Sequence, residues 1–324
     1  MMKNKTVQCV PNFSEGKDKV IIEKIVEPLK NQEGFKLISY ESDQNYNRTV
    51  VTLIGDPYKM LTPLLAFFKN AVEFIDMNQQ KGEHPRMGAI DVVPFIPIGH
   101  IDIDECVEIS KTFGKLVNDT LAIPVFLYAK SATTQDRVEL PSIRKGEFEG
   151  MQEKLQDPIW KPDFGDQIVH KTFGVVAIGA RLPLIAYNID IQTTDMKVTK
   201  KLAKTIRQSS GGFQYIQAGP ALLEDKGFAQ VTMNILDYKK NPIYRVYETI
   251  HMEALRYGLK IISSEIVGLV PKDALYRSLQ YYLDMEDIAY DKEMSIDDVT
   301  TYAIKYLALR DFDKYKIIEA HIED

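Results

Sequence analysis

The strongest constraint on this chain is an order of secondary-structure elements that its sequence predicts twice. Hydrophobic patterning over residues 6–98 predicts strand, helix, strand, strand, helix and strand, and the same order returns over residues 184–267. A strand or an amphipathic helix must bury its apolar side against another element. The sequence therefore predicts a mixed α/β or α+β fold with two ferredoxin-like βαββαβ units, although the two runs share little sequence identity.

The clearest element of the first run is a helix over residues 58–76, where apolar residues recur at helical spacing. A shorter helix is indicated by Ile21, Ile25 and Leu29, which lie four residues apart. Strands are expected over 6–10, 35–40, 49–54 and 92–98. After this run, Asp104 can cap a further helix. Short strands follow over 124–128 and 174–179, and the weakly patterned stretch 129–164 predicts an excursion with one short helix.

The second run predicts strands over 184–191, 214–219, 228–236 and 260–267, with helices over 197–208 and 243–258. From Lys272 onward the pattern is helical, and Ser295 is a plausible cap. We place the boundary near Gly179, which gives an N-terminal subdomain of residues 1–179 and a C-terminal subdomain of residues 180–324 with a helical tail.

Composition narrows the class of protein. The formal net charge of −6 argues against a nucleic-acid-binding surface. The two cysteines, Cys9 and Cys106, argue against a disulfide scaffold and a cysteine-rich metal site. The scattered histidines offer no zinc spacing, so no metal is expected. No long apolar run predicts a membrane span, and the first residues lack the apolar core of a signal peptide, so the expected location is the cytoplasm.

The most distinctive polar segment is KGEHPRMGAID, which spans Lys81 to Asp91. It is too polar to be core, and it lies between an amphipathic helix and an apolar strand. Loops held between buried elements often carry functional groups. His84 is its one side chain with an ordinary pKa near neutral pH. A solvated surface turn is the alternative interpretation, and Glu83 and Asp91 can be solvent-facing.

Two further polar loops in the first run contain Asn12 and the group Glu41, Asp43, Asn47 and Arg48. In a split βαβ unit such loops can meet the His84 loop at one end of the sheet. Carboxylates and a histidine can share acid–base work there, although Asn47 and Arg48 can equally form a turn with a surface arginine. The sequence contains no GxxxxGK[ST], HExxH or GxSxG motif, which argues against a P-loop enzyme, a zincin and a serine hydrolase.

Several of these segments together resemble the glutamate formimidoyltransferase family. They are VQCVPNFSEG from Val7, NRTV from Asn47, KGEHPRMGA from Lys81, PDFG from Pro162, IGAR from Ile178 and VGLVP from Val267. The likeness runs in order along essentially the whole chain. It implies a transferase that moves a formimidoyl group from N-formimidoyl-L-glutamate to N5 of tetrahydrofolate in histidine breakdown. It also implies two subdomains whose sheets face one another with the substrates between them.

The resemblance implies roles for particular residues. His84 corresponds to the family's catalytic histidine, and Glu41 or Asp43 to an acidic residue after the second strand. Tetrahydrofolate would be a co-substrate, and the stretch from Gly165 to Gly174 its contact region. The full set expected to bind glutamate or folate is Asn12, Asn47, Arg48, Lys81, Arg86, Met87, Gly88, Asp163, Phe164, Gly165, Thr172 and Gly174. The family suggests a homodimer, and the chain is too short to contain the cyclodeaminase attached in mammalian relatives.

The expected chemistry leaves alternatives open. A carboxylate can stabilise the amidine cation, and His84 can move a proton from N5 to the departing glutamate nitrogen. Arg48, Arg86 and Lys81 can orient the substrate carboxylates. Formyl transfer from N-formylglutamate would need a pocket that differs only in binding an oxygen atom where the formimidoyl group has an NH. A non-catalytic folate-binding protein is the other alternative, and the intact histidine loop weighs against it.

Overall fold

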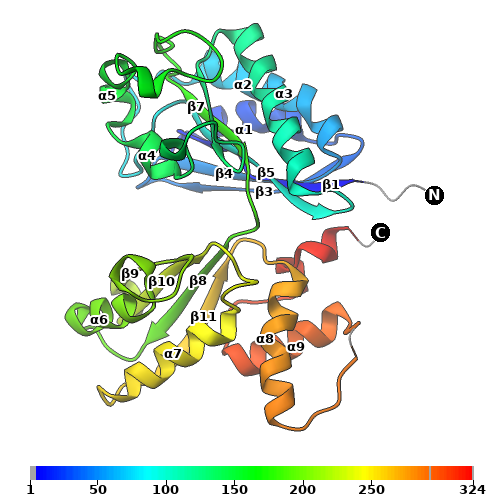
Figure 1. The fold of residues 1–324 in the computed structure, drawn as a ribbon, viewed down its shortest axis with the longest axis vertical. Helices are drawn as coiled ribbons and strands as arrows, with labels where there is room; N and C mark the ends of the chain where they lie inside the picture. Colours follow the sequence, from blue (N-terminus) through cyan, green and yellow to red (C-terminus); the bar gives the residue numbers. More distant parts are fainter. Residues whose placement is uncertain (1–4, 292, 323–324) are drawn as a thin grey trace. The chain divides into compact units, whose positions relative to one another are not determined.

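The computed structural model describes residues 5–291 and 293–322 of the chain. The chain divides into two compact units, Met1–Arg181 and Leu182–Asp324 (Figure 1). Each unit contains one sheet and its own core, so the prediction of a mixed α/β fold with two subdomains is confirmed. Within the described residues, no helix combines the length and apolarity that a membrane crossing needs.

The sheet of the first unit has seven strands, and β1 and β2 together occupy one position between β4 and β5. With β3 beside β4, these strands form the antiparallel order of a βαββαβ unit, as predicted. Two strands then extend the sheet, because β7 joins β5 and β6 joins β7, both in parallel. The strands are β1 (Thr6–Cys9), β2 (Asn12–Phe13), β3 (Phe35–Asp43), β4 (Arg48–Gly55), β5 (Ile90–Gly99), β6 (Val125–Ala129) and β7 (Val176–Ala180).

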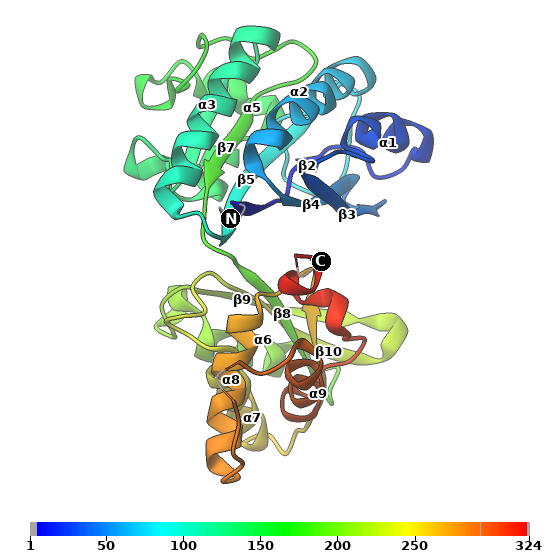
Figure 2. The same cartoon turned by 90° about the vertical axis from the view of Figure 1, so that its right-hand side faces the viewer.

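Three helices pack side by side on one face of this sheet: α1 (Lys19–Val26), α2 (Pro57–Phe74) and α3 (Ile103–Leu121) (Figure 2). Their apolar stripes form the larger core of the unit, which contains an edge-to-face chain of Phe67, Phe68 and Phe113. The expected cap of α3 is corrected. The cap is Asp102, whose carboxylate accepts a hydrogen bond from the backbone N of Glu105 at 2.8 Å, and Asp104 lies in the first turn.

A smaller core lies on the other face, around β5, β6 and β7. It includes Phe126, Ile143 and Met151. The prediction of one short helix in residues 129–164 is wrong, because two α-helices form there: α4 (Leu140–Arg144) and α5 (Glu147–Lys154). Gly146 separates them with a φ of 95°, a left-handed conformation that interrupts a helix and suits glycine.

The second unit has a four-stranded antiparallel sheet in the order β11-β8-β10-β9, the order of a complete βαββαβ unit. Its strands are β8 (Ile185–Ile191), β9 (Ile216–Leu223), β10 (Phe228–Ile235) and β11 (Ile261–Val267), and its helices α6 (Met196–Ile206) and α7 (Ile243–Leu255). One sheet face and these helices bury a core around Tyr187. The predicted second repeat is therefore confirmed.

The helical tail contains α8 (Lys272–Met285) and α9 (Ile296–Leu307). Ser295 caps α9 as predicted, because its Oγ accepts a hydrogen bond from the N of Asp298 at 3.0 Å. The chain then returns to β11, where Arg310 N donates to the carbonyl of Ser264 at 2.9 Å. The Arg310 side chain binds the fully buried Asp190 at 2.8 Å and Glu265 at 2.8 Å, so it anchors the tail to the sheet.

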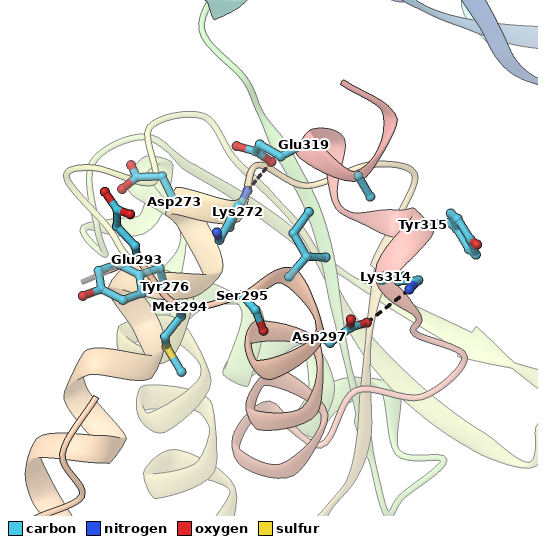
Figure 3. Close-up of a pocket in the computed structure, with 12 residues that line it drawn as sticks. Lys272, Asp273, Tyr276, Glu293, Met294, Ser295, Asp297, Lys314, Tyr315 and Glu319 are labelled. Atoms are coloured by element: carbon cyan, nitrogen blue, oxygen red, sulfur yellow. Dashed lines mark hydrogen bonds and ion pairs between the residues drawn. The ribbon is translucent and has the colours of Figure 1, made fainter. Parts of the chain in front are cut away.

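The tail also forms a pocket of about 790 Å³ where α8 and α9 begin (Figure 3). Glu319 accepts a hydrogen bond there from the N of Lys272 at 2.7 Å, and Lys314 pairs with Asp297 at 3.3 Å. All of its lining residues come from the second unit, and none was predicted as a site residue. None of the sequence motifs singled out above contributes to its lining, so this pocket does not define the candidate site.

Candidate active site

The His84 loop, residues 75–89, connects α2 to β5 and lies against the turn that follows β2. Ser14 joins the two segments: its N donates to the carbonyl of Ala89 at 2.8 Å, and its Oγ donates to the carbonyl of Gly88 at 2.8 Å. The buried Glu15 accepts a hydrogen bond from Nε2 of Gln80 at 2.9 Å. The turn in the motif PNFSEG therefore fixes the position of the loop.

Asn47 ties the same loop to the turn between β3 and β4. Its Oδ1 accepts a hydrogen bond from the N of Gly16 at 2.9 Å, and its Nδ2 donates to the carbonyl of Lys81 at 3.1 Å and to Oε1 of Gln80 at 2.5 Å. The residue has a φ of 48°, a left-handed conformation that asparagine tolerates. Because it is 5% exposed and its amide donors are used, Asn47 acts as a structural tie in this conformation.

Two glycines of the loop are required by close backbone contacts. A Cβ atom on Gly82 would lie 2.3 Å from the carbonyl oxygen of Tyr46, and one on Gly88 would lie 2.0 Å from that of Val175. Neither position has room for a side chain. The glycines of KGEHPRMGA thus allow the loop to lie directly on its neighbours, which places His84 beside β4.

The imidazole of His84 lies against Arg48 and Tyr46. Nη1 of Arg48 is 3.4 Å from Nδ1 of His84, and the ring centroids of Tyr46 and His84 are 6.2 Å apart. Nε2 of His84 is buried and has no hydrogen-bond partner in the part of the chain that the structure describes. A buried polar atom normally has a partner. This ring nitrogen is therefore available to a ligand.

The surroundings keep His84 uncharged. The pKa of its imidazole is lowered from 6.5 to about 4, chiefly by burial and then by the positive charges of Arg48 and Arg144, while the negative charge of Asp91 opposes the shift. The ring is therefore neutral at pH 7. A neutral imidazole has one nitrogen that can take a proton and one that can give a proton, as acid–base catalysis requires.

An ion pair that the sequence did not predict lies within the electrostatic range of this ring. Nε of Arg144, in α4, donates to Oδ2 of Asp91 at 2.8 Å, and a second nitrogen of the same guanidinium binds the same oxygen. Oδ1 of Asp91 accepts a hydrogen bond from the N of Met87 at 3.0 Å. Asp91 is 1% exposed, unlike the exposed Glu83. No pattern in residues 129–164 distinguishes Arg144 from other polar residues.

The two acidic candidates share a face of the sheet with Arg48. Asp43 lies opposite Arg48 across the β3–β4 pair, and Glu41 is two residues earlier on the same strand. Oδ1 of Asp43 accepts hydrogen bonds from the N of Asn45 at 2.8 Å and the N of Tyr46 at 2.9 Å, so it shapes the turn. Glu41 is exposed and has no partner among the described residues.

Arg86 is placed differently from Arg48. It is 6% exposed, and its terminal nitrogens bind Glu147 at 3.1 Å, Glu149 at 2.9 Å and the carbonyl of Gln80 at 2.6 Å. These contacts hold α5 against the loop. Met87, also expected to touch a substrate, is fully buried in the smaller core. Both residues support the loop in this conformation.

The PDFG motif is anchored by its aspartate. Asp163 accepts hydrogen bonds from the N of Leu127 at 2.7 Å, Oγ1 of Thr133 at 2.5 Å and Nη1 of Arg137 at 2.8 Å. Phe164 packs against the larger core, and Gly165 has a φ of 97°. The acceptor positions of Asp163 are occupied by the protein, which favours a structural role for this residue.

The stretch after this motif ends beside the His84 loop. The carbonyl of Thr172 accepts a hydrogen bond from the N of Met77 at 2.8 Å, and Gly174 forms an isolated bridge with Gly88. Asn12 lies in β2, where its Nδ2 donates to the carbonyl of Val10 at 3.0 Å. Lys81 is exposed at the start of the loop. Within residues 5–291 and 293–322, no group of three or more His, Cys, Asp or Glu is placed to hold a metal ion.

Comparisons with known proteins match both units. The formiminotransferase domain, N-terminal subdomain, matches residues 6–181, and the formiminotransferase domain matches residues 186–323. A glutamate formimidoyltransferase of Streptococcus pyogenes serotype M1 is 47% identical over 290 residues, which cover 90% of this chain and 97% of that protein. One of Thermoplasma acidophilum is 43% identical over 86% of this chain and 92% of that protein. The formimidoyltransferase-cyclodeaminase of Rattus norvegicus is 36% identical over 98% of this chain and 60% of that protein.

Proposed function

Because the chain belongs to the formiminotransferase family, we propose that it transfers the formimidoyl group of N-formimidoyl-L-glutamate to N5 of tetrahydrofolate. The chain is an enzyme and a transferase of this family. The products are L-glutamate and 5-formimidoyltetrahydrofolate. The observation that carries the proposal is the match to proteins named glutamate formimidoyltransferase over nearly the full length of both partners.

The reaction begins on an amidine, whose protonated form is a cation. The lone pair of N5 attacks the amidine carbon, and the C=N π electrons move to nitrogen. Glu41 and Asp43 supply negative charge on one sheet face, on the same side as Arg48. Of the two, Glu41 has no partner in the described chain, so it is the carboxylate free to pair with the amidinium.

His84 moves the proton that the exchange requires. After attack, N5 carries a proton that it must lose, and the glutamate nitrogen must gain one before the C–N bond breaks with its electron pair on that nitrogen. A neutral imidazole can take the first proton and supply the second, so the ring ends each cycle unchanged. The low pKa of His84 favours prompt release of the proton that it takes up.

Arg48 binds a substrate carboxylate or orients the reacting groups. It is half-buried, it lies beside His84, and its side chain stacks over Tyr46 with 5.5 Å between its guanidinium carbon and the ring centroid. A planar guanidinium can bind a carboxylate through two parallel hydrogen bonds. We assign no substrate contact to Arg86, because its terminal nitrogens bind α5 and the loop backbone.

The partners that follow from the proposal are two small molecules, formimidoylglutamate and tetrahydrofolate, with tetrahydrofolate as co-substrate. The homodimer and the cytoplasmic location remain predictions from the sequence. Sedimentation of the purified protein tests the first, and fractionation of the source cells tests the second.

The decisive experiment incubates the purified protein with tetrahydrofolate and either N-formimidoyl-L-glutamate or N-formyl-L-glutamate, and follows folate absorbance and release of glutamate. We expect turnover with the formimidoyl donor. Turnover with the formyl donor alone would replace the proposed reaction with formyl transfer. Folate binding in a calorimeter without turnover from either donor would indicate a binding protein.

A further inference from the structure

The contact between Arg48 and His84 determines which nitrogen of the ring carries the proton. A guanidinium is always protonated and only donates hydrogen bonds. Nη1 of Arg48 lies 3.4 Å from Nδ1 of His84, so Nδ1 must be the acceptor. In the neutral ring the proton is then on Nε2, because a neutral imidazole carries one proton. Nε2 is the buried nitrogen without a partner among the described residues.

The other groups around the ring do not favour the opposite tautomer. An N–H at Nδ1 would need an acceptor, and Asp91 is the carboxylate that acts on this ring. Both oxygens of Asp91 are already bound, Oδ1 by the N of Met87 and Oδ2 by Arg144. Arg144 and Arg86 add further positive charge, and Tyr46 contributes a ring face at a centroid distance of 6.2 Å. None of these groups supplies a free acceptor to Nδ1.

We propose that Arg48 is a positioning residue that holds the resting His84 as the neutral Nε2–H tautomer. The ring then presents a hydrogen-bond donor at Nε2. Its lone pair is at Nδ1, where the contact with Arg48 is long and can open easily. The inference rests on the proposed function only for its catalytic consequence. The tautomer itself is a property of the resting protein and can be measured without substrate.

The catalytic consequence is an order of proton movements. Nε2 gives its proton to the glutamate nitrogen as the electron pair of the C–N bond moves to that nitrogen. Nδ1 takes the proton that N5 loses through a water molecule, because Nδ1 and Nε2 face opposite sides of the ring, once Arg48 has moved from Nδ1 to a substrate carboxylate. The ring is an imidazolium only between uptake at Nδ1 and release from Nε2, and it ends neutral with its proton on Nδ1. It returns to the Nε2–H form after the product leaves, when Nδ1 releases its proton to water, Nε2 takes a proton from water, and Arg48 contacts Nδ1 again.

The test is nitrogen NMR of the protein labelled with 15N in its histidine rings. The chain has five histidines, and the His84 signals are assigned by their loss in His84→Gln. We expect a protonated Nε2 and an unprotonated Nδ1 at pH 7. In Arg48→Met the Nδ1 signal should shift toward the protonated position as the Nδ1–H tautomer becomes populated. Arg48→Lys should reverse part of this shift, because an ammonium group also only donates.

Arg86→Met is the matched control. It removes a positive charge that acts on the same ring, but Arg86 has no hydrogen bond to His84 and Asp91 keeps both of its partners, so the tautomer should not change while the pKa of His84 rises. Unchanged signals of His100, His170, His251 and His321 verify that each variant is folded. A resting Nδ1–H tautomer, or an identical tautomer ratio in Arg48→Met, would overturn the inference. A confirmed tautomer in a protein without turnover would instead count against the proposed function.

Discussion

Arg144 holds the buried carboxylate of Asp91 through two nitrogens on one oxygen, with Nε at 2.8 Å. The pair joins α4 to β5 next to the His84 loop, and the second oxygen of Asp91 binds the backbone N of Met87 at 3.0 Å. One ion pair thus links the irregular excursion, the sheet and the loop. The position of the candidate site depends on a contact between residues 53 positions apart in the sequence.

Removal of the cation should therefore destabilise the first unit. Arg144→Met leaves the carboxylate of Asp91 buried with its backbone hydrogen bond alone. Breaking a buried ion pair typically lowers the free energy of unfolding by about 3–5 kcal/mol. Because Arg144 is partly exposed, we expect a loss of about 3 kcal/mol. Urea denaturation of both proteins measures the free energy of unfolding.

Lys115→Met provides the comparison for an exposed pair. Lys115 binds Asp119 at 2.5 Å, but both side chains are more than half exposed. Such pairs contribute at most about 1 kcal/mol. Equal losses of unfolding free energy in Arg144→Met and Lys115→Met would show that the buried pair stabilises the protein no more than an exposed pair does.

His84→Ala should lose roughly two to four orders of magnitude in turnover, the usual contribution of an acid–base group. Binding of tetrahydrofolate should change little, because the backbone of the loop is fixed by other residues. Steady-state kinetics and calorimetry measure the two quantities. The control is His251→Ala, in which an exposed histidine on α7 is removed without loss of rate. A His84→Ala enzyme that turns over at the normal rate would exclude the acid–base assignment.

The low pKa of His84 predicts how stability responds to pH. The group has a pKa of about 4 in the folded chain, against its ordinary value of 6.5. Between these values the unfolded chain binds a proton that the folded chain does not, so the free energy of unfolding decreases as the pH falls from 6.5 to about 4. Above pH 6.5 the imidazole is neutral in both the folded and the unfolded chain, so His84 causes no loss of stability there.

The measurement is urea denaturation at several pH values in wild type and His84→Gln. Carboxylates titrate in both proteins, so the difference between the two curves isolates His84. The variant should show the weaker pH dependence through this window. Parallel curves would mean that the folded and unfolded pKa values of His84 are equal.

Substitution of Arg48 and of Arg86 by lysine distinguishes substrate binding from structural support of the His84 loop. Arg48→Lys should raise the Michaelis constant for one substrate by a free energy of about 1.5–3 kcal/mol, because lysine cannot reproduce the bidentate geometry. Arg86→Lys should lower the melting temperature and leave the affinity of the folded protein unchanged, since Arg86 binds Glu147 and Glu149. Thermal melts and substrate titrations of both variants distinguish these effects. Weaker substrate binding by folded Arg86→Lys would contradict its structural role.

Much of the fold was predictable because its signals are local. The apolar spacing of residues 58–76 predicted α2, which spans Pro57–Phe74, and Ser295 signalled the start of α9. Asp102 and Asp104 have the same chemistry, and only backbone geometry selects Asp102 as the cap of α3. The parallel addition of β7 and β6 to the sheet arises from pairing across long sequence distances, which periodicity does not report.

The candidate site was predictable in its motif but not in its contacts. KGEHPRMGA identified His84, yet a polar residue in a motif can serve a ligand or the loop itself. Asn47, Arg86 and Asp163 were expected to bind substrate, and each is occupied by protein partners in the structure. Arg144 was missed because the distance that joins it to Asp91 exists only after folding.

The ties on the His84 loop have a thermodynamic consequence for binding. Ser14, Asn47 and Arg86 restrict the loop while the site is empty, so most of its conformational entropy is lost when the chain folds. A ligand that enters the site need not order the loop again, and the preorganised backbone leaves more of the contact energy for affinity. The amide hydrogens of Glu83, Met87 and Ala89, which donate to groups outside the loop, should therefore exchange slowly in the resting protein, at a rate that depends on opening of the first unit.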